Sequence, residues 1–421
     1  MLNREDNALI CRVGPGTPMG TMMRRYWHPV CTSAQLERDA APLRLRLLGE
    51  DYVAFRDSAG RVGLMEELCM HRGASLALGR VEEGGIRCLY HGWKFSVAGE
   101  VLETPNHADP KYRARLQAPA FPVREEGGLI WAYVGPKELQ PEFSRYAFME
   151  ADPAHRVVLR VNVACNYLQL VEGGEDSSHV GVLHTNMARP GWKEGEFAPN
   201  PDVVNPAALS TNDLEPALKI EETAFGFQYV ALRKIDKAGA RNARVVPFIV
   251  PYGRIIPAPA FLFTVLEVPE DDTHTSTYIV VHGQAPVSED KIVELLGLDD
   301  QRYYDGKSCT FTATWADAFG QDRRQMQESW TGLRGVEVED AAIALSQGAF
   351  YDRSKEHLVP ADQAVVRVRR VLLDSVKRVM NNQAPVGVGV DLRGVSACDA
   401  ELQDGAAWQE LLPAHREAAT A

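Results

Sequence analysis

The pattern of apolar and polar positions divides the chain into an early part with strand patterns only and a later part that mixes strands and helices. Between residues 43 and 66, apolar and polar residues alternate and turn-forming residues interrupt them, which indicates short β-strands. Strand patterns return at 93–102 and 127–134, and Gly135-Pro136 then marks a break. We therefore expect a small all-β domain over residues 26–140.

The chain beyond residue 140 carries both kinds of pattern, beginning with a segment of helical character at 166–184. Alternating runs predict further strands at 217–234, 244–256, 260–268 and 274–283. Helical periodicity predicts helices at 289–297, 323–347 and 361–380. Strands with helices packed on one side indicate an α+β domain over residues 141–421, with the N-terminal segment 1–25 packed on it.

Composition agrees with two globular domains and narrows the class of partner. The 421 residues exceed one ordinary core, and their 45% hydrophobic and 24% charged content is typical of globular proteins. The net charge of −12, without a basic tract, argues against nucleic acid and anionic membranes as partners. The chain has neither a long apolar run nor a signal-like N-terminus, so we expect a cytoplasmic protein.

Two short motifs place one cysteine and one histidine in each of two loops. Cys69 and His71 lie in "CMHRG", and Cys88 and His91 follow in "CLYHGW". Zinc accepts two cysteines and two histidines, but its common modules pair like residues within an arm. A Rieske [2Fe–2S] cluster needs two thiolates on one iron and two imidazoles on the other, which two mixed arms provide. The sequence favours the Rieske cluster over zinc and over four unrelated turn residues.

The second group of candidate ligands lies in "NYLQLVEGGEDSSHVGVLH", at 166–184. Asp176 and His179 are three residues apart and would share a face of a helix. His179 and His184 are five apart, or about 140° around an ideal helix, so a straight helix cannot bring both to one ion. A bend or helix end near Gly181 is required. Alone, this spacing is also typical of one core histidine and one surface histidine.

A carboxylate would complete a two-histidine, one-carboxylate site for Fe(II) that keeps positions open for other ligands. The segment 335–348 offers Asp340, which we expect to lie on a helix in an apolar stripe with Val336 and Ile343. A carboxylate within such a stripe is costly unless it is paired or bound to metal. We therefore select Asp340 and expect its neighbours Glu337 and Glu339 to be solvated.

These motifs, in this order, resemble the catalytic α subunit of Rieske non-haem iron oxygenases over most of the chain. The segments "GPGTPMGTMMRRYWHPV" at 14–30, "EGGEDSSHVGVLH" at 172–184 and "YDRSKEHL" at 351–358 are similar to the phthalate-dioxygenase-type branch, which lacks a β subunit. The resemblance implies an N-terminal all-β Rieske domain. It also implies a C-terminal helix-grip domain, an antiparallel sheet wrapped on a long C-terminal helix.

The resemblance also implies cofactors, ligands and partners. Cys69, His71, Cys88 and His91 would hold the [2Fe–2S] cluster, and His179, His184 and Asp340 would hold mononuclear Fe(II). Asp176 would bridge His91 of one subunit to His179 of a neighbour, in a homotrimer or a hexamer of stacked trimers. Electrons would come from an NADH-dependent flavin and iron–sulfur reductase, and O₂ would be the co-substrate.

The family branch favours cis-dihydroxylation of an aromatic carboxylate, such as phthalate, isophthalate or a substituted benzoate. Other relatives act as monooxygenases by O-demethylation, methyl hydroxylation or diaryl-ether cleavage. Arg244, in an alternating segment, could hold the substrate carboxylate through two hydrogen bonds, with Arg233 and Lys234 as rivals and a solvated strand-edge position as the alternative. Two other classes stay open: a Rieske protein that only transfers electrons, and a zinc-stabilised binding module.

Overall fold

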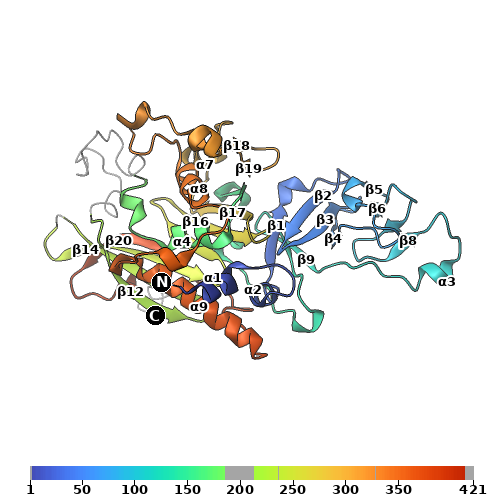
Figure 1. Cartoon of the computed structure of the whole chain (residues 1–421), viewed down its shortest axis with the longest axis horizontal. Helices are drawn as coiled ribbons and strands as arrows, with labels where there is room; N and C mark the ends of the chain where they lie inside the picture. The colour runs from blue at the N-terminus through green and yellow to red at the C-terminus, as the bar shows by residue number, and fades with distance from the viewer. Residues whose placement is uncertain (1, 185–212, 236, 328, 413–421) are drawn as a thin grey trace. The chain divides into compact units, whose positions relative to one another are not determined.

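The computed structural model describes residues 2–184, 213–235, 237–327 and 329–412, and Figure 1 labels its elements. The chain forms two compact units: Val13–Glu142, and Met1–Arg12 together with Phe143–Ala421. Helix α1 (Arg4–Cys11) belongs to the larger unit and helix α2 (Pro18–Met23) to the smaller, so the two units share the N-terminal segment. Residues 195–216 form a turn-rich segment of the sequence, and most of them lie outside the described residues.

The smaller unit is built from three antiparallel sheets, helix α2 and the short helix α3 (Pro110–Arg113). The first sheet has the order β1 (His28–Thr32), β10 (Leu129–Ala132), β9 (Val123–Glu126). The second is β2 (Leu43–Leu47), β3 (Glu50–Arg56), β4 (Val62–Glu66). The third is β5 (Arg80–Glu82), β6 (Gly85–Arg87), β7 (Lys94–Phe95), β8 (Val101–Glu103).

The core of the smaller unit contains the two motif cysteines. Cys69 and Cys88 pack in one buried cluster with Phe55, Trp93 and Phe95. The strand patterns that predicted this all-β unit arise because alternate residues face that core. The packed core therefore holds the beginning of each cysteine loop in a defined place.

The larger unit contains a ten-stranded sheet whose long strands pair antiparallel. Its path runs through β12 (Ala217–Thr223), β13 (Gly226–Lys234), β14 (Ala240–Ile249), β15 (Gly253–Pro257), β16 (Phe261–Pro269), β17 (Thr275–Gly283), β11 (Arg156–Val163), β19 (Thr310–Phe311) and β18 (Tyr304–Asp305). Strand β20 (Cys398–Gln403) pairs with β14. Strand β19 meets β11 in a short parallel contact.

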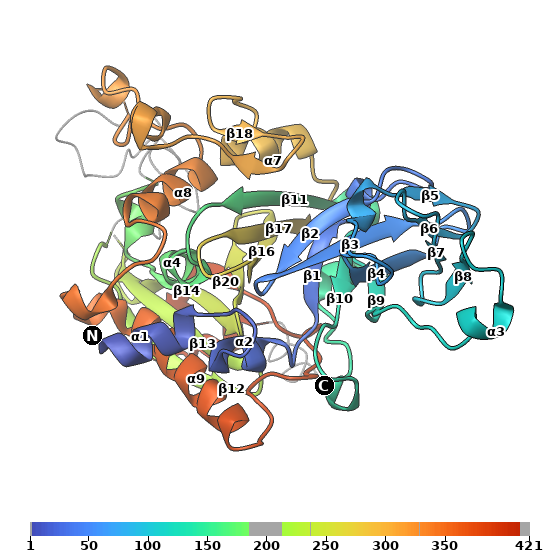
Figure 2. The same ribbon diagram turned by 45° about the vertical axis from the view of Figure 1, so that its right-hand side comes forward.

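Besides α1, the described helices of the larger unit include α4 (Tyr167–Glu175), α7 (Glu289–Leu296), α8 (Val336–Ser346) and α9 (Gln363–Met380). The long α9 runs beside β12 in both ribbon views and contacts it (Figure 2). Its buried residues recur at helical spacing, as in Val365, Val368 and Leu372. This antiparallel sheet with a long C-terminal helix confirms the α+β fold predicted from the sequence.

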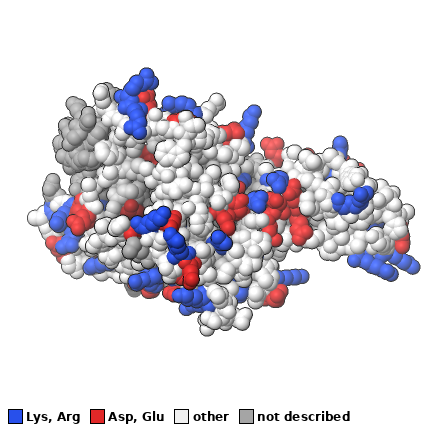
Figure 3. Space-filling model, in the orientation of Figure 1, with Lys and Arg blue, Asp and Glu red and all other residues white. Residues whose placement is uncertain are grey.

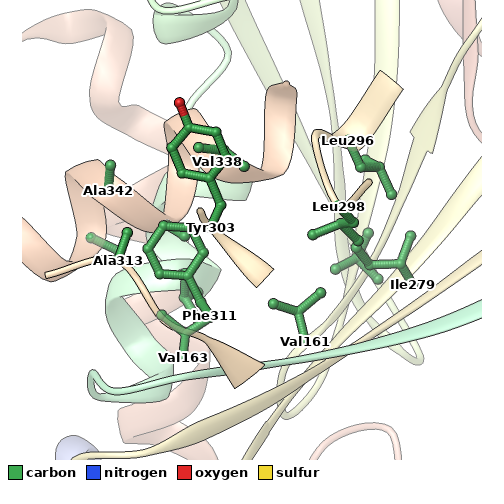
Figure 4. Close-up of a cluster of buried hydrophobic side chains, with 14 of the residues drawn as sticks. Val161, Val163, Ile279, Leu296, Leu298, Tyr303, Phe311, Ala313, Val338 and Ala342 are labelled. Atoms are coloured by element: carbon green, nitrogen blue, oxygen red, sulfur yellow. The ribbon is translucent and has the colours of Figure 1, made fainter. Parts of the chain in front are cut away.

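One predicted helix was wrong in its first half. The expected helix at 323–347 begins only at Val336, because Gly332 and Gly335 have φ angles of 66° and 100°, which an α-helix cannot accommodate. Helices α7 and α8 instead close a separate core against β11 and β17. Figure 4 shows part of it, including Val161, Ile279 and Val338.

Helix α1 is fixed by residues far along the chain. The Asn166 side chain donates to the Cys11 carbonyl at 2.8 Å, and the Tyr167 hydroxyl donates to the Ile10 carbonyl at 2.8 Å. Arg353, which is fully buried, donates to the Asn7 side chain at 3.2 Å. The N-terminal helix is thus an integral part of the larger unit.

The distribution of charge on the surface agrees with the lack of a basic tract in the sequence. Lys and Arg are interspersed with Asp and Glu over the face of the larger unit in Figure 3. Within the described part of the chain, no helix is both long and apolar enough to span a membrane.

Candidate metal centres

The two cysteine loops of the smaller unit share one backbone pattern. The Cys69 carbonyl accepts a hydrogen bond from the Gly73 N–H at 2.8 Å, and the Cys88 carbonyl accepts one from Gly92 at 3.0 Å. Both glycines have positive φ angles, 67° and 75°, which residues with a side chain adopt only at a cost. Each loop therefore makes the same tight turn after its cysteine.

The side chains of the two loops converge. The ring centroids of His71 and His91 lie 4.5 Å apart, and His71 stacks on Trp93 at 4.6 Å. The Cys69 thiol is within hydrogen-bonding reach of Cys88, and both cysteines are buried. The two sulfur and two imidazole groups proposed as ligands are thus close to one another.

The geometry of this quartet fits a two-iron cluster better than a single ion. Among the described residues, the one His, Cys, Asp and Glu set compact enough for a single metal ion is His179, His184 and Asp340. Burial raises the pKa of the Cys69 thiol to about 11, so a thiolate there needs a compensating cation such as iron. Burial and the neighbouring His91 lower the pKa of His71, which favours the neutral imidazole that a metal requires.

The second group of ligands is positioned by the end of helix α4. The helix stops at Glu175, and Asp176 caps it in an extended conformation, so the prediction that Asp176 and His179 share a helix face was wrong. The Asp176 carboxylate accepts from the Ser178 N–H at 2.7 Å, and a 3₁₀ turn then spans His179–Gly181. This change of direction supplies the bend that the five-residue spacing of the histidines required.

Three ligand atoms meet beyond that bend. The Nε2 atoms of His179 and His184 lie 3.2 Å apart. Oδ1 of Asp340, on α8, lies 3.3 Å from His184 Nε2 and 3.8 Å from His179 Nε2. All three atoms fall within the spread that one metal ion could coordinate. The donor set of two imidazoles and one carboxylate fits Fe(II) with open coordination positions.

Further carboxylates make this site favourable for positive charge. His184 Nδ1 lies 2.8 Å from Oε2 of Glu339. Although burial opposes it, the carboxylates of Asp340 and Glu339 raise the pKa of His184 to about 10. By contrast, burial lowers the pKa of His179, whose Nδ1 lies 3.8 Å from Oδ2 of Asp176. A metal cation would replace the proton that these groups attract.

The structure corrects the expected burial of helix α8. Ile343, placed in the apolar stripe with Asp340, is 46% exposed, and the buried stripe is instead Val338, Ala341 and Ala342. Glu337 and Glu339, expected to be solvated, are 9% and 3% exposed. The spacing of Val338, Ala341 and Ala342 was visible in the sequence, but their small side chains made it inconspicuous.

A cavity of about 370 Å³ opens beside these ligands. Its wall is mostly apolar and includes Val246, Ile256, Phe261, Phe263 and Leu296. The rings of Phe261 and Phe263 pack edge to face, with centroids 5.3 Å apart. His179, His184 and Asp340 also line this cavity, so an apolar molecule within it would face the candidate metal site.

Of the three cationic residues considered for substrate binding, only Arg244 lines this cavity. It is buried, not solvated at a strand edge, and its Nη1 donates to Asp399 at 3.1 Å and to the Pro257 carbonyl at 3.2 Å. Arg233 is also buried, and its Nη2 donates to the carbonyl and hydroxyl of Ser177, while Lys234 is exposed.

A second recess, of about 310 Å³, shares Asp176, His179 and Asp340 with the first cavity. It is more polar and includes Glu172, Glu356 and Arg369. The candidate ligands therefore line two hollows of the larger unit, an apolar cavity and a polar recess.

Comparison with known proteins agrees with this geometry. A Rieske [2Fe-2S] domain model matches residues 26–122, and a "LigXa C-terminal domain like" model matches residues 132–419. The phthalate 4,5-dioxygenase oxygenase subunit of Pseudomonas putida is 37% identical over 92% of this chain and 89% of its own length. The 3-chlorobenzoate-3,4-dioxygenase oxygenase subunit of Comamonas testosteroni is 31% identical over 91% of each chain.

Solved structures show the same fold at lower identity. NdmA of Pseudomonas putida CBB5 with caffeine has a TM-score of 0.60 and 18% identity, covering 92% of this chain and 98% of its own. Dicamba monooxygenase bound to dicamba has a TM-score of 0.58 and 18% identity, covering 86% and 100%. These similarities support the fold alone.

The chain belongs to the Rieske non-haem iron oxygenases, the class that the paired sites and the two-unit fold define. The resemblance to the phthalate-dioxygenase-type branch, noted from the motifs, is confirmed by the relatives. The family carries a Rieske [2Fe–2S] cluster and a mononuclear iron, and the structure contains a candidate site for each.

Proposed function

We propose that this chain is the oxygenase component of a multicomponent dioxygenase that converts an aromatic carboxylate to its ring cis-dihydrodiol. Reducing equivalents would come from NADH through a separate flavin and iron–sulfur reductase, and the enzyme would work in the cytoplasm. The observation that carries this proposal is the compact set of His179, His184 and Asp340 at the wall of an apolar cavity. Relatives named for phthalate and 3-chlorobenzoate dioxygenation support the substrate class.

The cofactors would be held by the residues already described. Cys69 and Cys88 would bind one iron of the cluster, and His71 and His91 the other. The triad of His179, His184 and Asp340 would bind Fe(II), which when bound supplies the redox chemistry with dioxygen.

The chain itself positions the substrate and excludes water. The apolar wall would bury an aromatic ring, and the edge-to-face pair Phe261 and Phe263 offers it aromatic contacts. Arg244 would receive the carboxylate. Only its Nη1 makes hydrogen bonds among the described residues, which leaves its other N–H groups available.

Electron transfer would join two copies of the chain. Around the cluster ligands of the smaller unit, Leu68, Leu89 and Tyr90 are 55–61% exposed, an apolar surface that favours a protein partner. We propose that this end of one subunit enters the polar recess of a neighbour, where Asp176 would link His91 to the neighbour's His179. A head-to-tail contact of this kind closes into a ring, so a homotrimer or a hexamer of stacked trimers is expected.

A second candidate function is monooxygenation, including O-demethylation of an aromatic acid. It is favoured by the similarity to the 5,5'-dehydrodivanillate O-demethylase oxygenase subunit of a Sphingobium species, 30% identical over 92% of this chain and 84% of its own length. The same metal sites would serve both reactions, so the product distinguishes them.

The first test is the metal content of protein purified without oxygen. Three irons and two acid-labile sulfides per chain, with the visible spectrum of a Rieske cluster, are expected. Two irons that do not become three on addition of Fe(II) would contradict the triad assignment, and zinc without sulfide would contradict both assignments. Turnover of aromatic carboxylates with NADH and a reductase would then separate cis-dihydrodiols from demethylated phenols.

A further inference from the structure

Two side chains of the larger unit hold the imidazole of His184 through its Nδ1 atom: Glu339 contacts it directly, and Thr331 holds Glu339. Its Nδ1 lies 2.8 Å from Oε2 of Glu339, and Oε1 of Glu339 accepts a hydrogen bond from the Thr331 hydroxyl at 2.6 Å. Glu339 is 3% exposed and Thr331 is 7% exposed. Every member of this chain of contacts is therefore sheltered from water.

We propose that Glu339 and Thr331 are positioning residues that fix His184 as the rigid ligand of the mononuclear metal site, an inference that rests on the proposed function. A carboxylate at Nδ1 requires the proton on that nitrogen, which leaves the lone pair of Nε2 directed toward His179 and Asp340. The negative charge of Glu339 also makes the imidazole a stronger donor to a metal.

Thr331 gives the carboxylate its orientation. Thr331 precedes α8, whereas Glu339 lies within that helix. The Thr331 hydroxyl reaches across this connection to the Glu339 carboxylate. The Thr331 carbonyl in turn accepts from the Gln321 side chain at 2.7 Å. The segment before α8 thereby restrains the Glu339 carboxylate, which would otherwise be free to rotate about its side-chain bonds.

The second histidine lacks such support. His179 Nδ1 is buried and makes no side-chain hydrogen bond among the described residues: the nearest carboxylate oxygen, of Asp176, lies 3.8 Å away, and the ring interacts instead with the Asp176 backbone. The two histidines are therefore unequal: His184 has a carboxylate at hydrogen-bonding distance from its Nδ1, and His179 does not. The two histidines of the triad would therefore contribute unequally to metal binding.

A buried carboxylate of this kind is costly unless it is bonded or serves a ligand. Glu339 meets that cost with one hydroxyl and one imidazole, and it adds a charge to the site where a cation would bind. A purely structural role would need the hydrogen bonds but not the charge, so the two roles can be separated by substitution.

The test is the affinity of the mononuclear site for Co(II), measured by equilibrium dialysis of full-length protein with its Rieske cluster intact. Glu339→Gln keeps the shape but removes the charge, and we expect its Kd to rise about 10- to 100-fold. Thr331→Val, which is isosteric, should raise Kd by less, and Thr331→Ser should restore the wild-type value.

Glu175→Gln is the matched control, because Glu175 is a buried carboxyl without a hydrogen bond to either histidine among the described residues. It should leave the Kd unchanged. Wild-type affinity in both Glu339→Gln and Thr331→Val would overturn the inference while the proposed function stands. Failure of the wild-type protein itself to bind the metal at this site would overturn both. Thermal unfolding of each variant identifies any loss of affinity caused by misfolding.

Discussion

Arg244 and Asp399 lie directly opposite each other on the paired strands β14 and β20, with Nη1 and Oδ2 3.1 Å apart. Both side chains are only about one-tenth exposed, so this ion pair is largely sequestered from water. Asn242 also donates to the Asp399 carboxylate, at 2.5 Å. The cation proposed to receive the substrate is thus partly neutralised by its own protein before any ligand arrives.

This pairing predicts opposite effects for its two members. Arg244→Met should weaken the binding of aromatic carboxylates and destabilise the fold by about 3–5 kcal/mol, because Asp399 is left buried without its partner. Asp399→Asn should lower KM for the same substrates, since the guanidinium becomes free to bind them.

The measurements are KM for a carboxylated substrate and for its uncharged analogue, together with the free energy of unfolding. A change in KM for both substrates alike would show that Arg244 shapes the cavity but does not receive the carboxylate.

Asp176 should be needed for electron transfer but not for metal binding. In Asp176→Asn the side-chain oxygen can still accept from the Ser178 N–H, so the loop that carries His179 is expected to keep its conformation. We expect unchanged iron content and cluster spectrum with most turnover lost. Stopped-flow reoxidation of the reduced cluster, with substrate and O₂ present, measures this step. Wild-type reoxidation rates in the variant would exclude Asp176 from the electron path.

Two adjacent glycines of α4 should respond in opposite directions to alanine. A Cβ at Gly173 meets nothing within 4 Å, so Gly173→Ala should stabilise the helix by about 0.5–1 kcal/mol. A Cβ at Gly174 would lie 2.0 Å from Nε of Arg254, a buried side chain paired with Glu267. Gly174→Ala should therefore destabilise the protein by about 1–3 kcal/mol. Denaturant unfolding of both variants tests the contrast, and equal effects would contradict the packing described for α4.

Stability should depend on pH through Glu175, which is fully buried with neither carboxylate oxygen hydrogen-bonded within the described residues. Burial raises its pKa from 4.5 to about 8. Between these values the unfolded chain loses a proton that the folded chain keeps, so stability falls as pH rises, by about 1.4 kcal/mol per pH unit from this group.

Glu175→Gln removes this pH-dependent contribution to the free energy of unfolding. The variant should become more stable than the wild type as pH increases from about 5 to 8, and the advantage should stop growing above the folded pKa. The difference in the free energy of unfolding between the two proteins, measured across that range, isolates this group from others that titrate. A difference independent of pH would show that Glu175 is ionised in the folded protein.

The sequence was most informative where chemistry demands a particular spacing. His179 and His184 could not share an ion on a straight helix; the structure ends helix α4 at Glu175, before both histidines, and places a 3₁₀ turn at His179–Gly181. The choice of Asp340 rested on a stripe with Ile343 that the structure does not contain, although Asp340 does meet the histidines. Asp340 therefore lies where the third ligand was expected, although the argument about helix faces that selected it was incorrect.

Other features depended on contacts between distant segments and could not be predicted. Glu339 meets His184, 155 residues away in sequence, only because α8 packs against α4. The partner of Arg244 comes from β20, which local patterns did not indicate. The late start of α8 differs from these cases, because Gly332 and Gly335 are poor helix formers and their signal was visible in the sequence.

The attachment of helix α1 has a consequence for biosynthesis. Residues Val13–Glu142 form one compact unit, whereas α1 is hydrogen-bonded by Arg353, 346 residues after Asn7, and also contacts the later helix α9. At about 5–20 residues per second, the ribosome needs roughly 20 to 70 s to supply them. Helix α1 is thus translated long before the residues that bury it, and during that interval its apolar face is exposed to solvent and to other proteins.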